Sequence, residues 1–196
     1  PSSLARREQG ADTGVFYGDF TREEKRPWDL VEGYGPLRNG RFRAEFRDGA
    51  VYDGMWKNDD LDGQGTMKYA NGAVYDGMWK NGKKHGQGKY TWANGDVYEG
   101  SWKDGTRDGE GKWTPASGDV YEGEWKDGKR HGHGKETRAN GVVYDGTWVN
   151  GKFHGRGKMK FANGDVYVGE YKNGHQGGQG TMKFANGNVY DGMWKN

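Results

Sequence analysis

The segment VYDGMWKNGKKHGQGKYTWANG, residues 74–95, sets the pattern for most of the 196-residue chain. Its tyrosine returns at a fixed step of 23 residues, each time with glycine two places later and a second aromatic residue four places later. The tyrosines of this series are Tyr52, Tyr75, Tyr98, Tyr121, Tyr144, Tyr167 and Tyr190. A repeat of this length and regularity is typical of a stacked-repeat architecture.

The composition predicts that aromatic side chains form the core. The chain has no isoleucine and only four leucines, whereas 14% of its residues are aromatic and 38 are glycine. Tyrosine and tryptophan bury large areas at a low cost in conformational freedom. We therefore expect these two residue types to replace the usual aliphatic core, and the glycines to make room for them.

Charge and cysteine content exclude several functional classes. The net charge is +2 and no block of like charge stands out, which disfavours nucleic-acid binding. The chain has no cysteine, so disulfides, thiolate metal sites and thiol nucleophiles are excluded and an intracellular location is favoured. No stretch approaches the roughly 20 apolar residues that cross a bilayer.

Each 23-residue unit reads as one antiparallel hairpin. In residues 74–80, Tyr, Gly and Trp alternate with other residue types, as expected for a strand. Asn-Gly at 81–82 is a turn signal that needs positive φ at both positions. Residues 83–92 form the return strand, in which a Gly-x-Gly pair predicts a bulge, and residues 93–95 turn the chain again. The fold class predicted is all-β: an elongated, single-layer, twisted antiparallel sheet of tandem hairpins.

Glycine explains how a single layer could cover its own aromatic face. A sheet without a second layer has nothing to pack its aromatic side chains against. Glycine on the same side as tyrosine and tryptophan leaves bare backbone, over which a ring from a neighbouring strand can lie.

Three segments are expected. Residues 1–15 are polar and are predicted to be a mobile arm. Residues 16–50 are predicted to be a degenerate capping repeat with an insert. Residues 51–196 are the array, with six full repeats and a final half repeat. The half repeat predicts an unpaired edge strand at 189–195, open to a partner or to a second copy in a homodimer, unless the natural chain is longer.

The repeat resembles the membrane occupation and recognition nexus (MORN) repeat. The resemblance rests on YEGSWKDG at 98–105 and on His-Gly-x-Gly at 85–88, 131–134 and 154–157. It covers residues 52–196 and implies a twisted all-β array that serves as a protein-interaction or scaffolding module, often at membranes and cytoskeletal structures. Four positions depart from the pattern, with aspartate or glycine in place of histidine or of a turn glycine: Asp59, Asp62, Asp108 and Gly177.

No catalytic, cofactor or metal site is predicted. His131 and His133 lie two apart and could share one face of a strand, but three of the five histidines occupy one repeat position, which favours a structural role. The acidic residues that follow the tyrosines form a row about 10 Å apart, too far for a shared proton. The sequence lacks the unique constellation that an active site needs.

Two binding surfaces are candidates. The aromatic face could keep an apolar groove for a partner segment, with these residues as partner contacts: Trp79, Trp92, Trp102, Trp125, Trp148 and Tyr171. The opposite face carries one lysine per repeat, which a lipid-binding interpretation would place against acidic head groups: Lys57, Lys80, Lys103 and Lys126. An acidic row on the same face offsets that charge, which favours solvated lysines.

The function predicted is a non-catalytic scaffold that bridges or stabilises protein partners in a larger assembly. A peripheral tether for acidic phospholipids and a regulatory module of a larger enzyme are the alternatives. The expected location is cytoplasmic, near cytoskeleton or membrane. An organellar complex reached after removal of a targeting segment is the alternative, since the sequence starts at Pro1 with Ser and Arg nearby.

Overall fold

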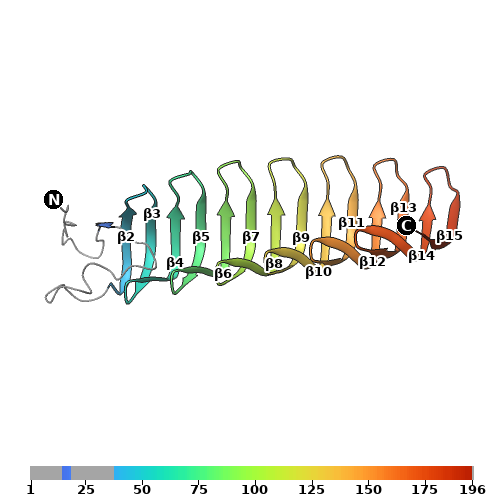
Figure 1. The fold of residues 1–196 in the computed structure, drawn as a ribbon. Coiled ribbons are helices and arrows are strands. Elements are labelled where there is room, and N and C mark those ends of the chain that lie inside the picture. Colours follow the sequence, from blue (N-terminus) through green and yellow to red (C-terminus); the bar gives the residue numbers. More distant parts are fainter. Residues whose placement is uncertain (1–14, 19–37, 196) are drawn as a thin grey trace. The chain divides into compact units, whose positions relative to one another are not determined.

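The computed structural model describes residues 15–18 and 38–195 of the chain. This part of the chain consists of strands and turns, without a helix. It therefore includes no helix of the length and hydropathy that a membrane span requires. The chain divides into two compact units, residues 1–93 and 94–196, each with its own run of strands (Figure 1).

In the first unit each strand lies beside the next one along the chain. The pairs from β2 onward are antiparallel, whereas β1 pairs with β2 in parallel. The strands are β1 (Val15–Gly18), β2 (Gly40–Phe46), β3 (Val51–Lys57), β4 (Asp60–Lys68), β5 (Val74–Lys80) and β6 (Lys83–Thr91).

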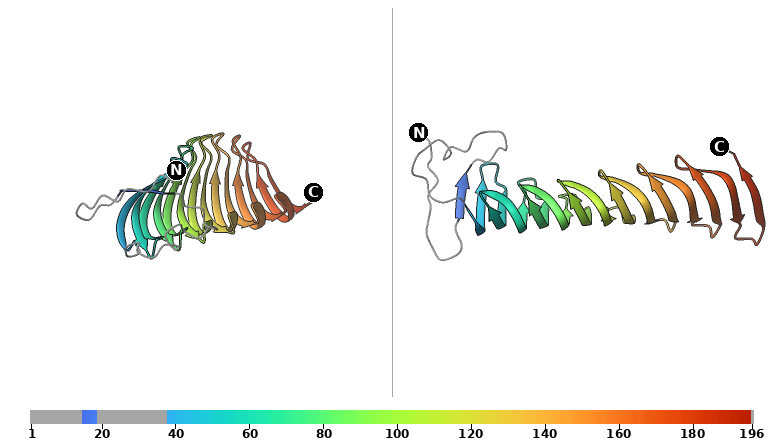
Figure 2. Two further views of the ribbon diagram at one scale, coloured as in Figure 1. Left: turned by 60° about the vertical axis from the view of Figure 1, so that its left-hand side comes forward. Right: turned by 90° about the horizontal axis from the view of Figure 1, so that it is seen from below.

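The second unit continues the same pattern with antiparallel pairs throughout. Figure 2 shows its strands, green to red, following one another in one layer. They are β7 (Val97–Lys103), β8 (Thr106–Thr114), β9 (Val120–Lys126), β10 (Lys129–Thr137), β11 (Val143–Val149), β12 (Lys152–Lys160), β13 (Val166–Lys172), β14 (His175–Lys183) and β15 (Val189–Trp194).

The predicted fold class is confirmed: the chain is all-β and is built from tandem hairpins of 23 residues. The pair β1–β2 departs from the antiparallel pattern. Residues 1–14 of the predicted arm and residues 19–37 of the predicted capping repeat lie outside the described residues.

The hairpin turns have the geometry that Asn-Gly predicts. In all six two-residue turns the first residue has φ of 48–53° and the second has φ of 67–94°. Positive φ at both positions matches the twist of the flanking strands and keeps the hairpins tight. In the first of these turns an aspartate, Asp59, adopts φ of 67° at the position that glycine holds elsewhere.

The Gly-x-Gly pair forms the predicted bulge. Its first glycine has φ of 57–103° in all six return strands. The strand register shifts beside it in every hairpin, for example between Gly77 and Trp79 of β5 against β6. The return strand therefore pairs with the first strand in two segments, one on each side of the bulge.

The second glycine of each pair belongs to a row that crosses the strands. In the first unit Gly54, Gly65, Gly77 and Gly88 are paired one after another. The tyrosine of each repeat lies over this row: a Cβ on Gly88 would lie 2.3 Å from the Tyr75 hydroxyl oxygen. The glycine row is therefore the surface that supports the tyrosine rings, as the sequence predicts. The same ring also covers Gly77 of its own strand.

Tryptophan closes the core between successive hairpins. In the second unit Tyr121 packs edge-to-face on Trp125 of its own strand at 5.2 Å and on Trp148 of the next hairpin at 5.1 Å between ring centroids. The Trp148 indole N–H donates to the carbonyl of Gly134 at 2.9 Å. The Tyr121 hydroxyl donates to the carbonyl of Glu124 at 2.8 Å. Each tyrosine of the series from Tyr52 to Tyr167 has at most about 1% of its surface exposed.

Candidate functional site

The sheet presents two faces. We call the side that carries the repeated tyrosines and tryptophans the aromatic face, and the opposite side the outer face. Five of the six predicted partner contacts are core residues with 2–6% of their surface exposed: Trp79, Trp102, Trp125, Trp148 and Tyr171. The sixth, Trp92, is half-buried. Partner binding by these six side chains stays a prediction.

In the first unit the aromatic face carries a half-buried cluster at the ends of β4 and β6. Tyr90 packs on Trp92 at 4.3 Å and on Tyr69 at 5.8 Å between ring centroids. The Lys84 ammonium lies over Tyr90 at 4.2 Å, over Tyr75 at 5.7 Å and over Tyr69 at 6.0 Å. Burial lowers the pKa of Lys84 to about 8. Burial also raises the pKa of Tyr69 to about 12, with Tyr90 contributing in the same direction.

The same repeat position holds arginine in the next two hairpins. Arg107 lies over the Trp125 ring with its Cζ 4.2 Å from the centroid, and its Nη2 donates to the carbonyl of Gly128 at 2.9 Å. Arg130 lies over Tyr121 at 4.9 Å and over Trp148 at 5.1 Å. Guanidinium groups interact well with aromatic faces, because the rings are electron-rich above their plane. The aromatic face thus carries cations on top of its core.

One carboxylate joins two of these cations. Glu136 is buried, with 8% of its side chain exposed, at a position that elsewhere holds methionine or an aromatic residue. It accepts from Arg130 at 2.5 Å and from the Nε and Nη2 atoms of Arg138, both at 3.0 Å. Arg138 also lies 6.0 Å from the Phe153 ring centroid. Two guanidinium groups share one buried carboxylate.

The outer face alternates in charge. Strand register places Lys112 between Glu99 and Glu122, and Lys135 between Glu122 and Asp145. Lysines therefore face carboxylates along this surface. The four lysines of the lipid-binding interpretation, Lys57, Lys80, Lys103 and Lys126, are exposed and close the first strand of their hairpins.

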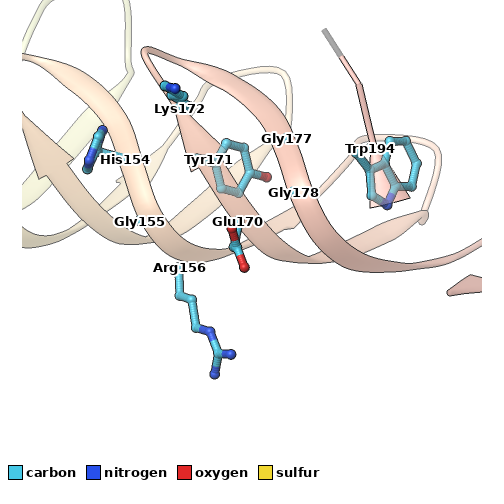
Figure 3. Close-up of a pocket in the computed structure, with 9 residues that line it drawn as sticks. All are labelled: His154, Gly155, Arg156, Glu170, Tyr171, Lys172, Gly177, Gly178 and Trp194. Carbon is cyan, nitrogen blue, oxygen red and sulfur yellow. The ribbon is translucent and has the colours of Figure 1, made fainter. Parts of the chain in front are cut away.

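A hollow lies at the repeat in which Tyr171 and Gly177 depart from the pattern (Figure 3). Its volume is about 630 Å³, and Tyr171 stands there in place of tryptophan and Gly177 in place of histidine. Figure 3 shows Tyr171 between His154 on one side and Trp194 on the other, with Arg156 pointing away. The remaining lining residues are Gly155, Glu170, Lys172 and Gly178. A smaller aromatic ring and three glycines leave this space open.

A second hollow of about 440 Å³ lies where the outer-face charge alternation ends. Val168, 52% exposed, occupies a position that holds aspartate or glutamate in the other repeats. Beside it His133 pairs with Asp145 at 3.2 Å. The other side chains that line the hollow are Arg156, Gln179 and Thr181.

Metal-binding geometry does not appear in the described part of the chain, where no group of three or more His, Asp or Glu side chains could hold an ion. His133, one of the two histidines considered as ligands, contacts the Asp145 carboxylate instead. Glu124 accepts from the His133 backbone N–H at 2.7 Å.

The cations of the aromatic face were not among the residues that the sequence singled out. Lys84, Arg107 and Arg130 share one repeat position, nine residues after the tyrosine, where Leu61, Phe153 and Gln176 stand in other hairpins. Variation at a fixed repeat position is the signal that could have found them. Only the bulge shows that this position faces the tyrosine, because the simple alternation of the return strand is broken there.

Comparisons with known proteins gave distant structural similarities. A comparison with curated protein sequences gave no match. The solved TCP domain of Drosophila melanogaster SAS-4 (dCPAP), in complex with a proline-rich motif of Ana2 (dSTIL), is 12% identical, with a TM-score of 0.44 over 84% of this chain and 88% of that one. The TCP10 domain of Danio rerio CPAP is also 12% identical, with a TM-score of 0.46 over 77% of this chain and 71% of that one. Likeness at this level says nothing about what this chain binds.

A family model supplies the assignment. The model described as MORN repeat matches six consecutive segments, residues 52–74, 75–97, 98–120, 121–143, 144–166 and 167–189. These segments begin at the six tyrosines that recur from Tyr52 to Tyr167, and together they cover more than half of the chain. The chain therefore belongs to the MORN-repeat family.

Proposed function

We propose that this chain is a non-catalytic scaffold that binds protein partners through its aromatic face and so bridges or stabilises them in a larger assembly. The observation that carries the proposal is the cluster of Tyr69, Tyr90 and Trp92. These rings are half-buried and contact one another, on the face that the repeated tyrosines build. Aromatic side chains of this kind supply large contact areas at low entropic cost and are enriched at protein interfaces.

The division of labour within the repeat supports this proposal. The tyrosine and tryptophan that recur in every hairpin are buried and serve the core. Several residues on or just after the return strands differ between hairpins and keep part of their surface exposed, for example Trp92, Trp113 and Phe153. A uniform core with a varied surface lets one scaffold offer different contacts along its length.

The charge pattern of the outer face disfavours binding to an acidic lipid surface. A lysine near an anionic membrane contributes about 1 kcal/mol of attraction. Here carboxylates alternate with the lysines across the strands, so neighbouring charges of opposite sign cancel much of that field. This face also has exposed apolar side chains, such as Met55 and Met78, which occur once per hairpin.

The test is recovery of partners with the full chain. Tagged wild-type protein and a Trp92→Ala variant would be purified from cells that contain the natural assembly, and the bound proteins identified by mass spectrometry. We expect partners to be lost with Trp92→Ala. The control is Met78→Ala on the outer face of the same unit, where the side chain is 41% exposed. Partners kept by Trp92→Ala but lost by Met78→Ala would contradict the proposal.

A flotation assay tests the alternative that the chain binds acidic lipids. Liposomes with phosphoinositides would be mixed with the protein at physiological salt and floated on a gradient. We expect the protein to stay at the bottom. Flotation that disappears when Lys80 and Lys103 are replaced with glutamine would show that the outer face binds acidic lipids instead.

A further inference from the structure

We propose that the aromatic face of β8–β12 binds an extended acidic peptide segment, with two carboxylate side chains three residues apart followed by an apolar residue. This inference rests on the proposed function and names the chemical class of the partner segment. The strands concerned run from yellow-green to orange in Figure 1.

Three guanidinium groups lie on this part of the face, and in the part of the chain that the structure describes one of them has no carboxylate contact. Within the described residues, Glu136 is the carboxylate that contacts them, and it pairs with Arg130 and Arg138. Arg107 has its one hydrogen bond with the carbonyl of Gly128 and otherwise lies over the rings of Trp113 and Trp125. Among direct contacts within residues 38–195 there is therefore one carboxylate for three cations, and Arg107 has no carboxylate contact.

Arg107 and Arg130 are partly buried, so water screens their charges poorly. The side chain of Arg130 is 26% exposed and that of Glu136 is 8% exposed. Burial lowers the pKa of Arg107, and the charge of Arg130 acts in the same direction although Tyr98 opposes it. A half-buried charge that has no carboxylate partner interacts more strongly with an incoming opposite charge than an exposed one does. A carboxylate that reaches Arg107 would therefore form a charge-assisted hydrogen bond.

The spacing of the cations matches an extended chain. Arg107 and Arg130 occupy the same position in consecutive hairpins. They therefore lie two strand spacings apart, which is about 10 Å. A peptide in the extended polyproline II conformation advances about 3.1 Å per residue with three residues per turn, so side chains three residues apart point to the same side and lie about 9 Å from one another. A segment that crosses the strands would place the carboxylate at position i over Arg107 and the one at i+3 over the Arg130–Arg138 pair, in which Arg138 is the more exposed.

The next hairpin extends the pattern with an apolar contact. Phe153 follows Arg130 at the same repeat position, and it stacks on Tyr144 at 3.9 Å between ring centroids. It is half-buried and so keeps surface for a partner. An apolar side chain at i+6 would meet it. Trp113 and Arg138 border the same track, Arg138 with 41% of its side chain exposed.

Synthetic peptides can test this pattern with the full chain. The probe is a fluorescein-labelled peptide of about a dozen residues, with glutamates at i and i+3 and phenylalanine at i+6 in a Gly-Ser background. A second peptide has the order reversed, because the strands do not dictate the direction of a crossing segment. A third has the same composition with the glutamates adjacent. Binding is followed by fluorescence polarisation at low and at physiological salt.

Two matched double variants each remove two positive charges, one variant from each face of the sheet. Arg107→Gln with Arg138→Gln removes two cations from the aromatic face. Lys112→Gln with Lys135→Gln removes two from the outer face of the same two hairpins. We expect the arginine pair to weaken binding of one spaced peptide at least about tenfold, since charge-assisted hydrogen bonds are lost. We expect the lysine pair to change it by less than about twofold, because exposed charges contribute little.

Each other outcome would overturn the proposal. Equal binding of the peptide with adjacent glutamates would show attraction without a spaced site, and equal weakening by the lysine pair would show net charge alone. Absence of peptide binding, together with phosphoinositide vesicle binding that needs Arg107 and Arg138, would assign the cations to a lipid surface. Arg138→Gln alone repeats the test if thermal unfolding shows that the Arg107 variant is destabilised.

This test is independent of the partner-recovery experiment. Loss of partners with Trp92→Ala, together with no binding of either spaced peptide, would leave the scaffold function standing and remove the acidic segment. Trp92 belongs to the first unit, whereas all residues varied here belong to the second.

Discussion

At the scale of single residues, the core depends on the absence of side chains as much as on their presence. Gly88 illustrates this, because its φ is ordinary and its role is purely steric. A Cβ there would lie 2.3 Å from the Tyr75 hydroxyl oxygen and 2.6 Å from ring carbons. Tyr75 in turn has no exposed surface, and its hydroxyl donates to the carbonyl of Met78 at 2.9 Å. The glycine and the tyrosine ring therefore fit each other closely.

We predict that Gly88→Ala destabilises the protein by about 1–3 kcal/mol, the usual cost of overpacking a filled core. Urea unfolding followed by tryptophan fluorescence measures it. In a Tyr75→Phe background the cost should fall, because the nearest clashing atom is gone. Gly82→Ala is the control: a Cβ there meets nothing within 4 Å, but φ is +70°. Its cost, about 1–2 kcal/mol for left-handed backbone, should not depend on Tyr75.

At the scale of elements, the first hairpin turn combines a less favourable turn residue with a buried ion pair. Asp59 adopts φ of 67°, which favours glycine. Its carboxylate accepts from the backbone N–H of Arg38 at 2.9 Å and from Nε of Arg38 at 2.7 Å. Both side chains are at most 7% exposed, and Arg38 also lies 3.9 Å from the Trp56 ring centroid. The aspartate thus anchors a buried cation to the start of the array.

We predict that Asp59→Gly destabilises the protein although it restores the Asn-Gly turn. Glycine adopts the left-handed backbone conformation more easily than aspartate, which stabilises the folded protein by about 1–2 kcal/mol. Loss of one partner of a buried ion pair costs about 3–5 kcal/mol, because the remaining charge stays buried. The loss therefore exceeds the gain, and the midpoint of chemical unfolding should fall. Asp59→Asn, which keeps an acceptor oxygen, should lie between the two; a midpoint unchanged or raised in Asp59→Gly would refute this ranking.

At the scale of the whole molecule, buried tyrosines and one buried lysine make the free energy of unfolding depend on pH. Burial raises the pKa of the core tyrosines well above 10, to about 12 for Tyr144. Burial lowers the pKa of Lys84 to about 8 from 10.5. The two effects act on stability in opposite directions as pH rises. Between pH 8 and 10.5 the unfolded chain binds more protons at Lys84 than the folded chain, so folding becomes more favourable with rising pH.

We predict that the free energy of unfolding rises from pH 8 to about pH 10 through Lys84 and falls above it through the tyrosines. The fall follows because the folded state holds the tyrosine protons to higher pH than the unfolded state does. Chemical unfolding at closely spaced pH values would measure both limbs. In Lys84→Met the rising limb should disappear while the falling limb remains. A rising limb that persists in Lys84→Met would assign it to another group.

Much of the architecture could be predicted because it follows from local chemistry repeated many times. Alternation in residues 74–80 indicates a strand, Asn81-Gly82 requires a turn with positive φ, and paired glycines indicate a bulge. The site could be predicted less well. Trp92 was among the predicted contacts and is half-buried, but Arg107 and Arg130 were not considered, because the bulge that turns them toward the rings interrupts the strand period.

The sequence by itself determined the repeat length, the hairpins, the turn geometry and the tyrosine–glycine pairing, because each of these depends on residues close together in one repeat. The tertiary structure decided what lies between repeats. It placed Trp148 of one hairpin against Tyr121 of the one before, buried the predicted tryptophan contacts, and joined Glu136 to Arg130 and Arg138. The physical reason is that these contacts depend on strand register and on the bend at the bulge, which only the assembled sheet defines.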